Sequence, residues 1–230
     1  MGADSRVILW DFDGTLCRAD GLWRSALMVA LDEQLAGHGV TSDELRPHFR
    51  DGFPWHRPDV AHPELSDPEA WWAEVGGLFA RAGKAVGLSE DVAVPLARRA
   101  RQVVIDPSSY ELFDDVRPAL TALRGRGWRH LILSNHVPEL ADIVCGLGIA
   151  DLFEAVLTSA LIDYEKPHPE AFRLALEKAG QPEVVWMVGD NVQADIAGAE
   201  AAGVPAILIR QDGQAKRRAA DCWDVAEIVG

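Results

Sequence analysis

The chain has 230 residues, 48% of them hydrophobic and 25% charged, with a formal net charge of −14 at pH 7. This mix is typical of a globular protein, and the acidic balance opposes nucleic acids and anionic membranes as main partners. No apolar stretch approaches the roughly 18 residues of a membrane-spanning helix, and no signal peptide is visible. The cysteines are widely spaced and odd in number, so we expect a cytoplasmic, reducing environment without disulfides.

The first predicted element is a buried strand over residues 7–10, which ends at Asp11. An apolar run without alternation is typical of a parallel sheet that is covered on both faces. Such sheets place their chemistry beyond the carboxyl ends of the strands, so Asp11 and Asp13 reach the mouth of a predicted crevice. Two carboxylates this close favour a divalent cation, and Mg²⁺ accepts such ligands. Taken alone, the pattern also fits a polar turn at Asp13 and Gly14.

Residues 18–105 lack strand-like runs and show helical spacing, so we predict a smaller, all-helical insertion after the first strand. Asp20 is a candidate cap for its first helix. Thr41 and Glu44 have the spacing of a capping box, and Asp67 precedes a proline at a first helical position. The insertion leaves from the turn that follows the first strand, so we expect it to cover the crevice.

From about residue 110 onward, predicted strands alternate with predicted helices, a pattern that indicates a parallel sheet. The further strands are predicted at residues 130–133, 155–157, 184–188 and 206–209. Asp115 is a candidate cap for the helix that precedes the strand at residues 130–133. The tail from Gln211 gives no clear pattern. The expected fold is α/β: a Rossmann-like doubly wound core from residues 1–17 and 106–230, with residues 18–105 as a helical cap.

Four strand ends or adjoining loops therefore carry polar groups to one edge of the sheet. The groups are Asp11 with Asp13, Ser134 with Asn135, Lys166, and Asp190 with Asp195. Each has an ordinary alternative in isolation, as a turn, a solvated charge or a helix cap. Their order and their placement at strand ends favour one shared site.

These residues resemble the motifs of the haloacid dehalogenase-like hydrolase superfamily, and the resemblance covers nearly the whole chain. Residues 11–15 (Asp-Phe-Asp-Gly-Thr) are similar to its first motif, Ser134-Asn135 to its second, Lys166-Pro167 to its third, and residues 189–195 to its fourth. A helical insertion between the first two motifs resembles the subgroup that contains phosphoglycolate phosphatase, β-phosphoglucomutase and haloacid dehalogenase.

The resemblance implies a Mg²⁺-dependent phosphatase that acts on a small phosphate ester. It makes Asp11 the nucleophile that forms an aspartyl-phosphate, and Asp13 the general acid and base. The Asp11 carboxylate, the Asp13 backbone carbonyl and the Asp190 carboxylate would bind Mg²⁺. Thr15, Ser134, Asn135 and Lys166 are the implied contacts to substrate. Asp195 is implied as a partner of Lys166 or of a metal-bound water.

Several alternatives stay open. A phosphomutase shares every motif, whereas the dehalogenases of this superfamily generally lack an aspartate at the position of Asp13. A non-catalytic binding module has no reason to gather three carboxylates and a lysine. The candidates for facing the crevice from the insertion are Trp55, His56, Arg57, His62, Trp71 and Trp72. Helical spacing favours the tryptophans as core residues. We expect a monomer or a homodimer.

Overall fold

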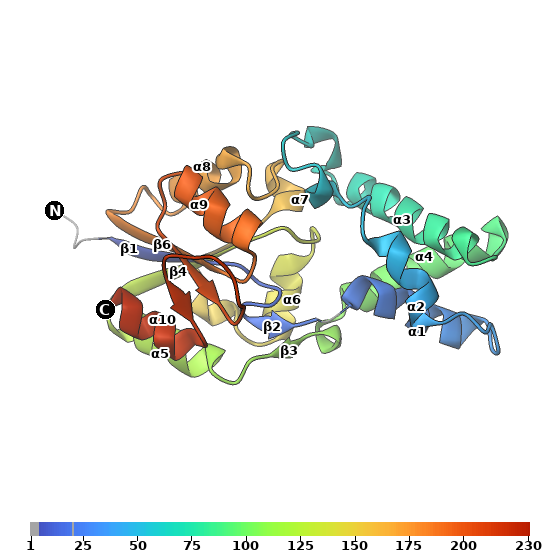
Figure 1. Ribbon diagram of the computed structural model, residues 1–230, viewed down its shortest axis with the longest axis horizontal. Helices are drawn as coiled ribbons and strands as arrows, with labels where there is room; N and C mark the ends of the chain where they lie inside the picture. The colour runs from blue at the N-terminus through green and yellow to red at the C-terminus, as the bar shows by residue number, and fades with distance from the viewer. Residues whose placement is uncertain (1–4, 20) are drawn as a thin grey trace.

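A computed structural model gives the fold of the chain and describes residues 5–19 and 21–230. Its centre is a six-stranded sheet with the order β5-β4-β1-β6-β7-β8, in which every pair is parallel (Figure 1). The strands are β1 (Arg6–Trp10), β4 (Trp128–Ser134), β5 (Ala155–Thr158), β6 (Val184–Gly189), β7 (Ala206–Ile209) and β8 (Arg218–Ala219). The predicted Rossmann-like α/β architecture is confirmed.

Strand β1 lies in the middle of the sheet, and its two faces belong to two different apolar layers. Ile8 and Trp10 pack with α5 (Val116–Gly125), α6 (Leu140–Gly146) and α10 (Cys222–Val229). Val7 and Leu9 pack on the other face with α8 (Pro169–Lys178) and α9 (Gly198–Ala201). Burial on both faces explains why the run shows no alternation of apolar and polar residues.

The register of β1 brings the predicted motifs to one edge of the sheet. Trp10 lies opposite Ile132 of β4 on one side and Val188 of β6 on the other. The chain therefore leaves β1, β4 and β6 at nearly the same level, at the carboxyl ends of all three strands. In an open parallel sheet this is the place where ligands bind.

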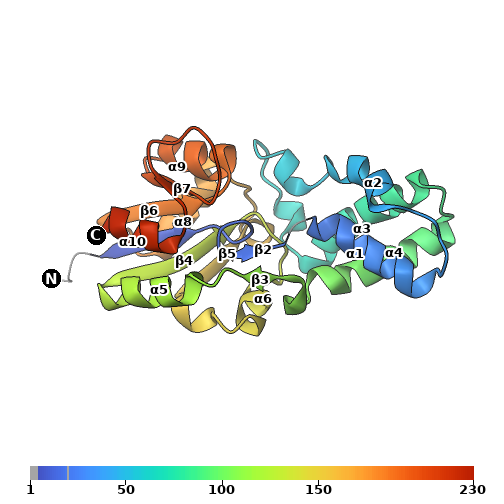
Figure 2. The ribbon, with the colours of Figure 1, turned by 60° about the horizontal axis from the view of Figure 1, so that its bottom comes forward.

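The helices between residues 22 and 104 lie beyond these carboxyl ends, on one side of the molecule (Figures 1 and 2). They are α1 (Leu22–Gln34), α2 (Ser42–Leu45), α3 (Pro68–Ala85) and α4 (Glu90–Val104), and short 3-10 helices lie between α2 and α3. We call this part the helical unit. The chain enters and leaves it through β2 (Cys17–Arg18) and β3 (Glu111–Leu112), which pair antiparallel. The domain boundaries at 17/18 and 105/106 stay a prediction.

Two of the predicted helix caps are confirmed. Thr41 and Glu44 form a capping box at the start of α2, and the Asp67 side chain accepts from two backbone N–H groups of α3. Asp20 lies outside the described residues, and α1 begins directly after Gly21. Among the described residues, no helix combines the length and the apolar character that crossing a membrane requires.

The predicted cap at Asp115 is wrong, because its side chain makes other hydrogen bonds. Both carboxylate oxygens accept from Nη2 of Arg210, at 2.9 and 2.7 Å, and one also accepts from the backbone N–H of Cys222 at 2.7 Å. Arg210 in addition donates from Nε to the carbonyl of Thr15 at 3.0 Å. This largely buried pair therefore ties the end of β7 and the start of α10 to the loop after β1.

The end of the chain also differs from expectation. The helix predicted from residue 194 begins at Val192 as a π-helix (Val192–Ala197) and continues into α9. The tail after Gln211 forms β8 and α10, which complete the sheet and one of its apolar layers. The strands β2, β3 and β8 have two residues each, which is too short to produce a periodic pattern in the sequence.

We predict that Asp115→Ala lowers the free energy of unfolding by about 2 to 3 kcal/mol, because it leaves the Arg210 guanidinium largely buried without its carboxylate. For a chain of this size the melting temperature falls by about 4 to 10 °C in a thermal melt. The neighbouring Asp114 is exposed, so Asp114→Ala is the matched control and changes stability by less than about 0.5 kcal/mol. Equal effects of the two substitutions would contradict the assignment.

Candidate active site

The carboxyl ends of β1, β4 and β6 open onto a cavity of about 400 Å³. The sheet side contributes Asp11, Asp13, Gly14, Ser134, Asn135, Lys166, Asp190, Asn191, Ala194, Asp195 and Gln211, and the helical unit with its entry contributes Ala19, Gly21, Trp23 and Trp55. All but one of the site residues predicted from the sequence line this cavity. The exception is Thr15, which is fully buried, and its hydroxyl has no partner among the described residues.

Lys166 is the electrostatic centre of the site. Its Nζ donates to Oδ1 of Asp11 at 2.7 Å and to Oδ1 of Asp195 at 2.6 Å, and the side chain is only 2% exposed. Burial opposes the charge, but the two carboxylates more than offset it, so the pKa of Lys166 is raised. The lysine therefore stays protonated and holds two acidic side chains that would otherwise repel each other.

Asn135 holds the loop that carries Lys166. Its Nδ2 donates to the carbonyl of Lys166 at 2.8 Å, and its Oδ1 accepts from the backbone N–H of Lys166 at 2.7 Å. The asparagine thus acts as a two-point clamp between the end of β4 and the loop before α8. This contact accounts for an amide side chain at this strand end, next to the buried Ser134.

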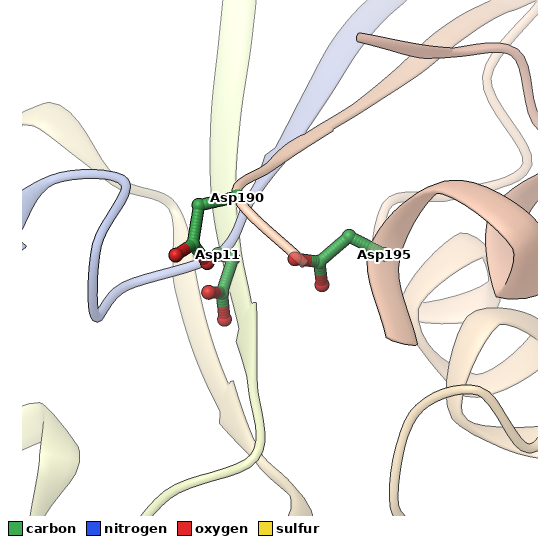
Figure 3. A group of neighbouring side chains, drawn as sticks. All are labelled: Asp11, Asp190 and Asp195. Atoms are coloured by element: carbon green, nitrogen blue, oxygen red, sulfur yellow. The ribbon is translucent and has the colours of Figure 1, made fainter. Parts of the chain in front are cut away.

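Asp190, directly after β6, completes an acidic group with Asp11 and Asp195. One carboxylate oxygen of each lies within 4.8 Å of the others, and Figure 3 shows Asp195 reaching toward Asp11 and Asp190 from a separate segment. Burial and the charges of Asp11 and Asp195 raise the pKa of Asp190 to about 7. Burial also raises the pKa of Asp195 to about 6, although Lys166 opposes this shift.

The residues present fit a hard divalent cation. Lys166 already supplies a cation to Asp11 and Asp195, whereas Asp190 has a raised pKa and no basic partner within salt-bridge distance among the described residues. Gly14, with a φ of +71°, leaves room for it, because a Cβ atom there would overlap the Asp190 carboxylate. Carboxylate oxygens are the ligands that Mg²⁺ prefers. Asp11 and Asp190 would hold the ion, with Asp195 nearby on Lys166.

The surroundings of Asp13 reveal a residue that sequence reasoning missed. The Asp13 side chain is 41% exposed and has the Cys17 thiol 3.7 Å from Oδ1 and His136 Nε2 3.4 Å from Oδ2. Burial and the charge of Asp13 raise the pKa of Cys17, so the thiol keeps its proton. His136 directly follows Ser134 and Asn135 at the end of a predicted strand, and that position was the available signal.

Two indole rings form the side of the cavity that belongs to the helical unit. Trp23 and Trp55 are half-buried, with ring centroids 5.5 Å apart, and Phe53 stacks on Trp55 at 4.5 Å. Of the six candidates from the sequence, only Trp55 lines the cavity. His56, Arg57, His62, Trp71 and Trp72 do not. Trp23, in the first turn of α1, is the second lining ring.

Comparison with known proteins gives a consistent picture. The family model for haloacid dehalogenase-like hydrolases matches residues 5–203. A phosphoserine phosphatase of Thermus thermophilus is 35% identical over 89% of this chain and 88% of its own length. The human haloacid dehalogenase-like hydrolase domain-containing protein 3 is 29% identical over 89% of this chain and 81% of its own. A haloacid dehalogenase-like (HAD) hydrolase of Bacillus subtilis, bound to magnesium, has a similar fold, with a TM-score of 0.78 at 19% identity and 99% coverage of both chains.

We predict that Asp190→Asn stabilises the metal-free protein. An ordinary aspartate has a pKa near 3.8, whereas Asp190 in the folded protein has one of about 7. Between pH 3.8 and pH 7 the Asp190 carboxyl is protonated in the folded state and ionised in the unfolded state. The free energy of unfolding therefore falls as the pH rises through this range, and the full loss is reached above about pH 7. With chelator at pH 8, the substitution therefore raises the free energy of unfolding by about 2 to 4 kcal/mol, where the upper figure is the full effect of the raised pKa and the lower one allows for screening by solvent.

Thermal melts from pH 8 down to about pH 5 check this prediction, and the gain shrinks as the pH falls. Added Mg²⁺ stabilises the wild type more than the variant, because the variant lacks one ligand. The exposed Asp59 gives the control Asp59→Asn, which changes neither quantity. An increase in stability that is constant with pH would contradict the electrostatic explanation.

Proposed function

The chain belongs to the haloacid dehalogenase-like hydrolase family, and on that basis we propose that it is a Mg²⁺-dependent phosphatase of small phosphate monoesters. The observation that carries the proposal is one cavity in which the buried ammonium of Lys166 meets the carboxylates of Asp11 and Asp190. A carboxylate can attack phosphorus only where cations offset the repulsion between two anions. This cavity offers one cation and a place for a second.

In the first step a carboxylate oxygen of Asp11 attacks phosphorus, and the bond from phosphorus to the leaving oxygen breaks. Asp13 enters protonated and gives its proton to the leaving oxygen, so the product departs as a neutral alcohol. Lys166 lies on Asp11 and can follow the charge onto the phosphoryl oxygens. The hydroxyl of Ser134 and the backbone N–H of Asn135 are proposed as further donors to these oxygens.

In the second step water attacks the phosphorus of the aspartyl-phosphate, and the bond from phosphorus to the Asp11 oxygen breaks. Asp13, now a carboxylate, takes the proton from this water, which restores both aspartates and releases inorganic phosphate. Mg²⁺, when bound by Asp11, Asp190 and the backbone carbonyl of Asp13, supplies positive charge for the phosphoryl oxygens in both steps.

The helical unit is proposed to act as a cap that covers the substrate and selects its leaving group. Trp23 and Trp55 support this role, because both line the cavity that also holds the acidic side chains. Their flat rings favour a leaving group that presents an apolar face. A cavity of about 400 Å³ accommodates a metabolite and not a folded protein.

Two other activities use the same residues. A phosphomutase also forms an aspartyl-phosphate, and it differs in passing the phosphoryl group to a sugar phosphate and not to water. A dehalogenase is disfavoured because Asp13 is present, although a 2-haloacid dehalogenase of Pseudomonas syringae has a similar fold, with a TM-score of 0.69 at 23% identity. Curated relatives named phosphoserine phosphatase and glyceraldehyde 3-phosphate phosphatase favour hydrolysis. The cytoplasmic location and the oligomeric state stay predictions.

We predict that the purified protein releases phosphate from members of a phosphate-ester panel and that a chelator abolishes the release until Mg²⁺ is restored. Asp11→Asn lowers the rate on the order of a thousandfold or more, because the nucleophile is lost. The exposed Asp114 provides the control Asp114→Asn, which keeps full activity. Phosphate transfer to a sugar phosphate in place of water identifies a mutase, and halide release from a chloroacid without any ester hydrolysis rejects the proposal.

We also predict that Trp55→Leu raises KM about tenfold for an ester with a ring as leaving group, because the ring loses an aromatic contact surface. The same substitution leaves KM for a two-carbon alkyl phosphate nearly unchanged, since that group is too small to cover the indole. Steady-state kinetics measures both values. Trp223 lies exposed on α10, so Trp223→Leu is the matched control. Equal changes for both esters would remove Trp55 from the leaving-group site.

A further inference from the structure

His136 is a buried histidine that the reaction described above does not use. Its side chain is 1% exposed. The centroid of its ring lies 5.4 Å from that of Phe12, in an edge-to-face arrangement, and 5.8 Å from that of Tyr110, whose ring is tilted against it. Its backbone carbonyl accepts from Oγ1 of Thr158 at 2.6 Å. The ring is therefore fixed by packing on both sides and by a hydrogen bond at its base.

The partners of Nε2 decide which ring nitrogen carries the proton. Tyr110 donates its hydroxyl to the carbonyl of Val104 at 2.7 Å, so toward His136, at 3.5 Å, it offers only a lone pair. The other neighbour of Nε2 is Oδ2 of Asp13, at 3.4 Å, an ion-pair distance at which the two groups are not aligned for a hydrogen bond in this structure. Catalytic contacts of this kind are often long without substrate and tighten when it binds. With lone pairs on both sides, Nε2 is the protonated nitrogen and its N–H lies between Tyr110 and Asp13, and Asp13 then carries the proton that it transfers on Oδ1.

We propose that His136 is a positioning residue for Asp13: its Nε2–H holds Oδ2, so that Oδ1 of the Asp13 carboxylic acid is turned toward the leaving oxygen to which it gives its proton. The Cys17 thiol, near Oδ1, limits the same rotation from the other side. A residue that only filled space here would need no N–H group, and an apolar side chain would avoid the buried Nδ1 that has no partner among the described residues.

The proposal rests on the proposed phosphatase reaction, and its test separates the two by comparing esters with different leaving groups. An alkoxide leaves only with a proton from the general acid, whereas an activated aryl oxide leaves without one. The ratio kcat/KM covers the steps up to departure of the leaving group. Misplacing Asp13 therefore lowers kcat/KM for an alkyl phosphate and spares it for an activated aryl phosphate.

The variants are His136→Leu and His136→Phe, which remove the N–H, and the second keeps a ring of similar size. We expect either folded variant to lose about 10- to 100-fold in kcat/KM for the alkyl ester and less than about threefold for the activated aryl ester. His136→Gln restores an N–H near the position of Nε2 and recovers most of the loss. Thermal melts establish that each variant is folded.

His130, on β4, is the matched control, because it is buried like His136 but neither of its ring nitrogens contacts Asp13. They lie 3.1 Å from Nε1 of Trp10 and 3.1 Å from the carbonyl of Leu120. His130→Gln leaves the alkyl-to-aryl ratio unchanged. Equal losses for both esters, or no loss, would overturn the positioning role of His136. A wild type that hydrolyses neither ester would instead refute the proposed phosphatase.

Discussion

The site depends on one constraint: carboxylate oxygens of Asp11, Asp190 and Asp195 lie within 4.8 Å of one another in a largely buried cavity. Lys166 makes this arrangement possible for Asp11 and Asp195, because its ammonium donates to both. Among the residues that the structure describes, Asp190 has no such partner within salt-bridge distance, and burial together with the charges of Asp11 and Asp195 raises its pKa. The protein thus keeps part of its acidic group uncompensated, which is unfavourable for folding and favourable for binding a cation.

The sheet is what fixes these charges in space. Asp11 and Asp190 follow neighbouring parallel strands in register, so the distance between them is set by backbone hydrogen bonds and two apolar layers. Lys166 comes from a loop, and Asn135 replaces the missing strand pairing by binding both backbone groups of that lysine. Gly14 lets the chain turn next to Asp190, where any side chain would collide with the carboxylate.

The sequence was informative where local pattern and final environment agree. Five apolar runs became strands, and their ends located nearly all of the predicted site, because parallel strands share one functional edge. The features that were missed depend on contacts between distant segments. The Asp115 side chain accepts from Arg210 and does not cap its own helix, and the ring of Trp23 lines the cavity beside Trp55. No local spacing encodes such choices.

The two halves of the proposed chemistry have different supports. The Lys166 half depends on the sheet alone, whereas Asp13 lies beside Cys17 at the entry to the helical unit, and Tyr110, at its exit, reaches Val104 of α4. Among the described residues, polar contacts between the helical unit and the sheet side include Glu139, which accepts from Trp72 and Arg101, and the carbonyl of Asp163, which accepts from the backbone N–H of His62. Such hydrogen bonds contribute about 1 kcal/mol each. A movement of the helical unit would therefore alter the surroundings of Asp13 directly, and it would reach Lys166 through the loop that begins at Asp163.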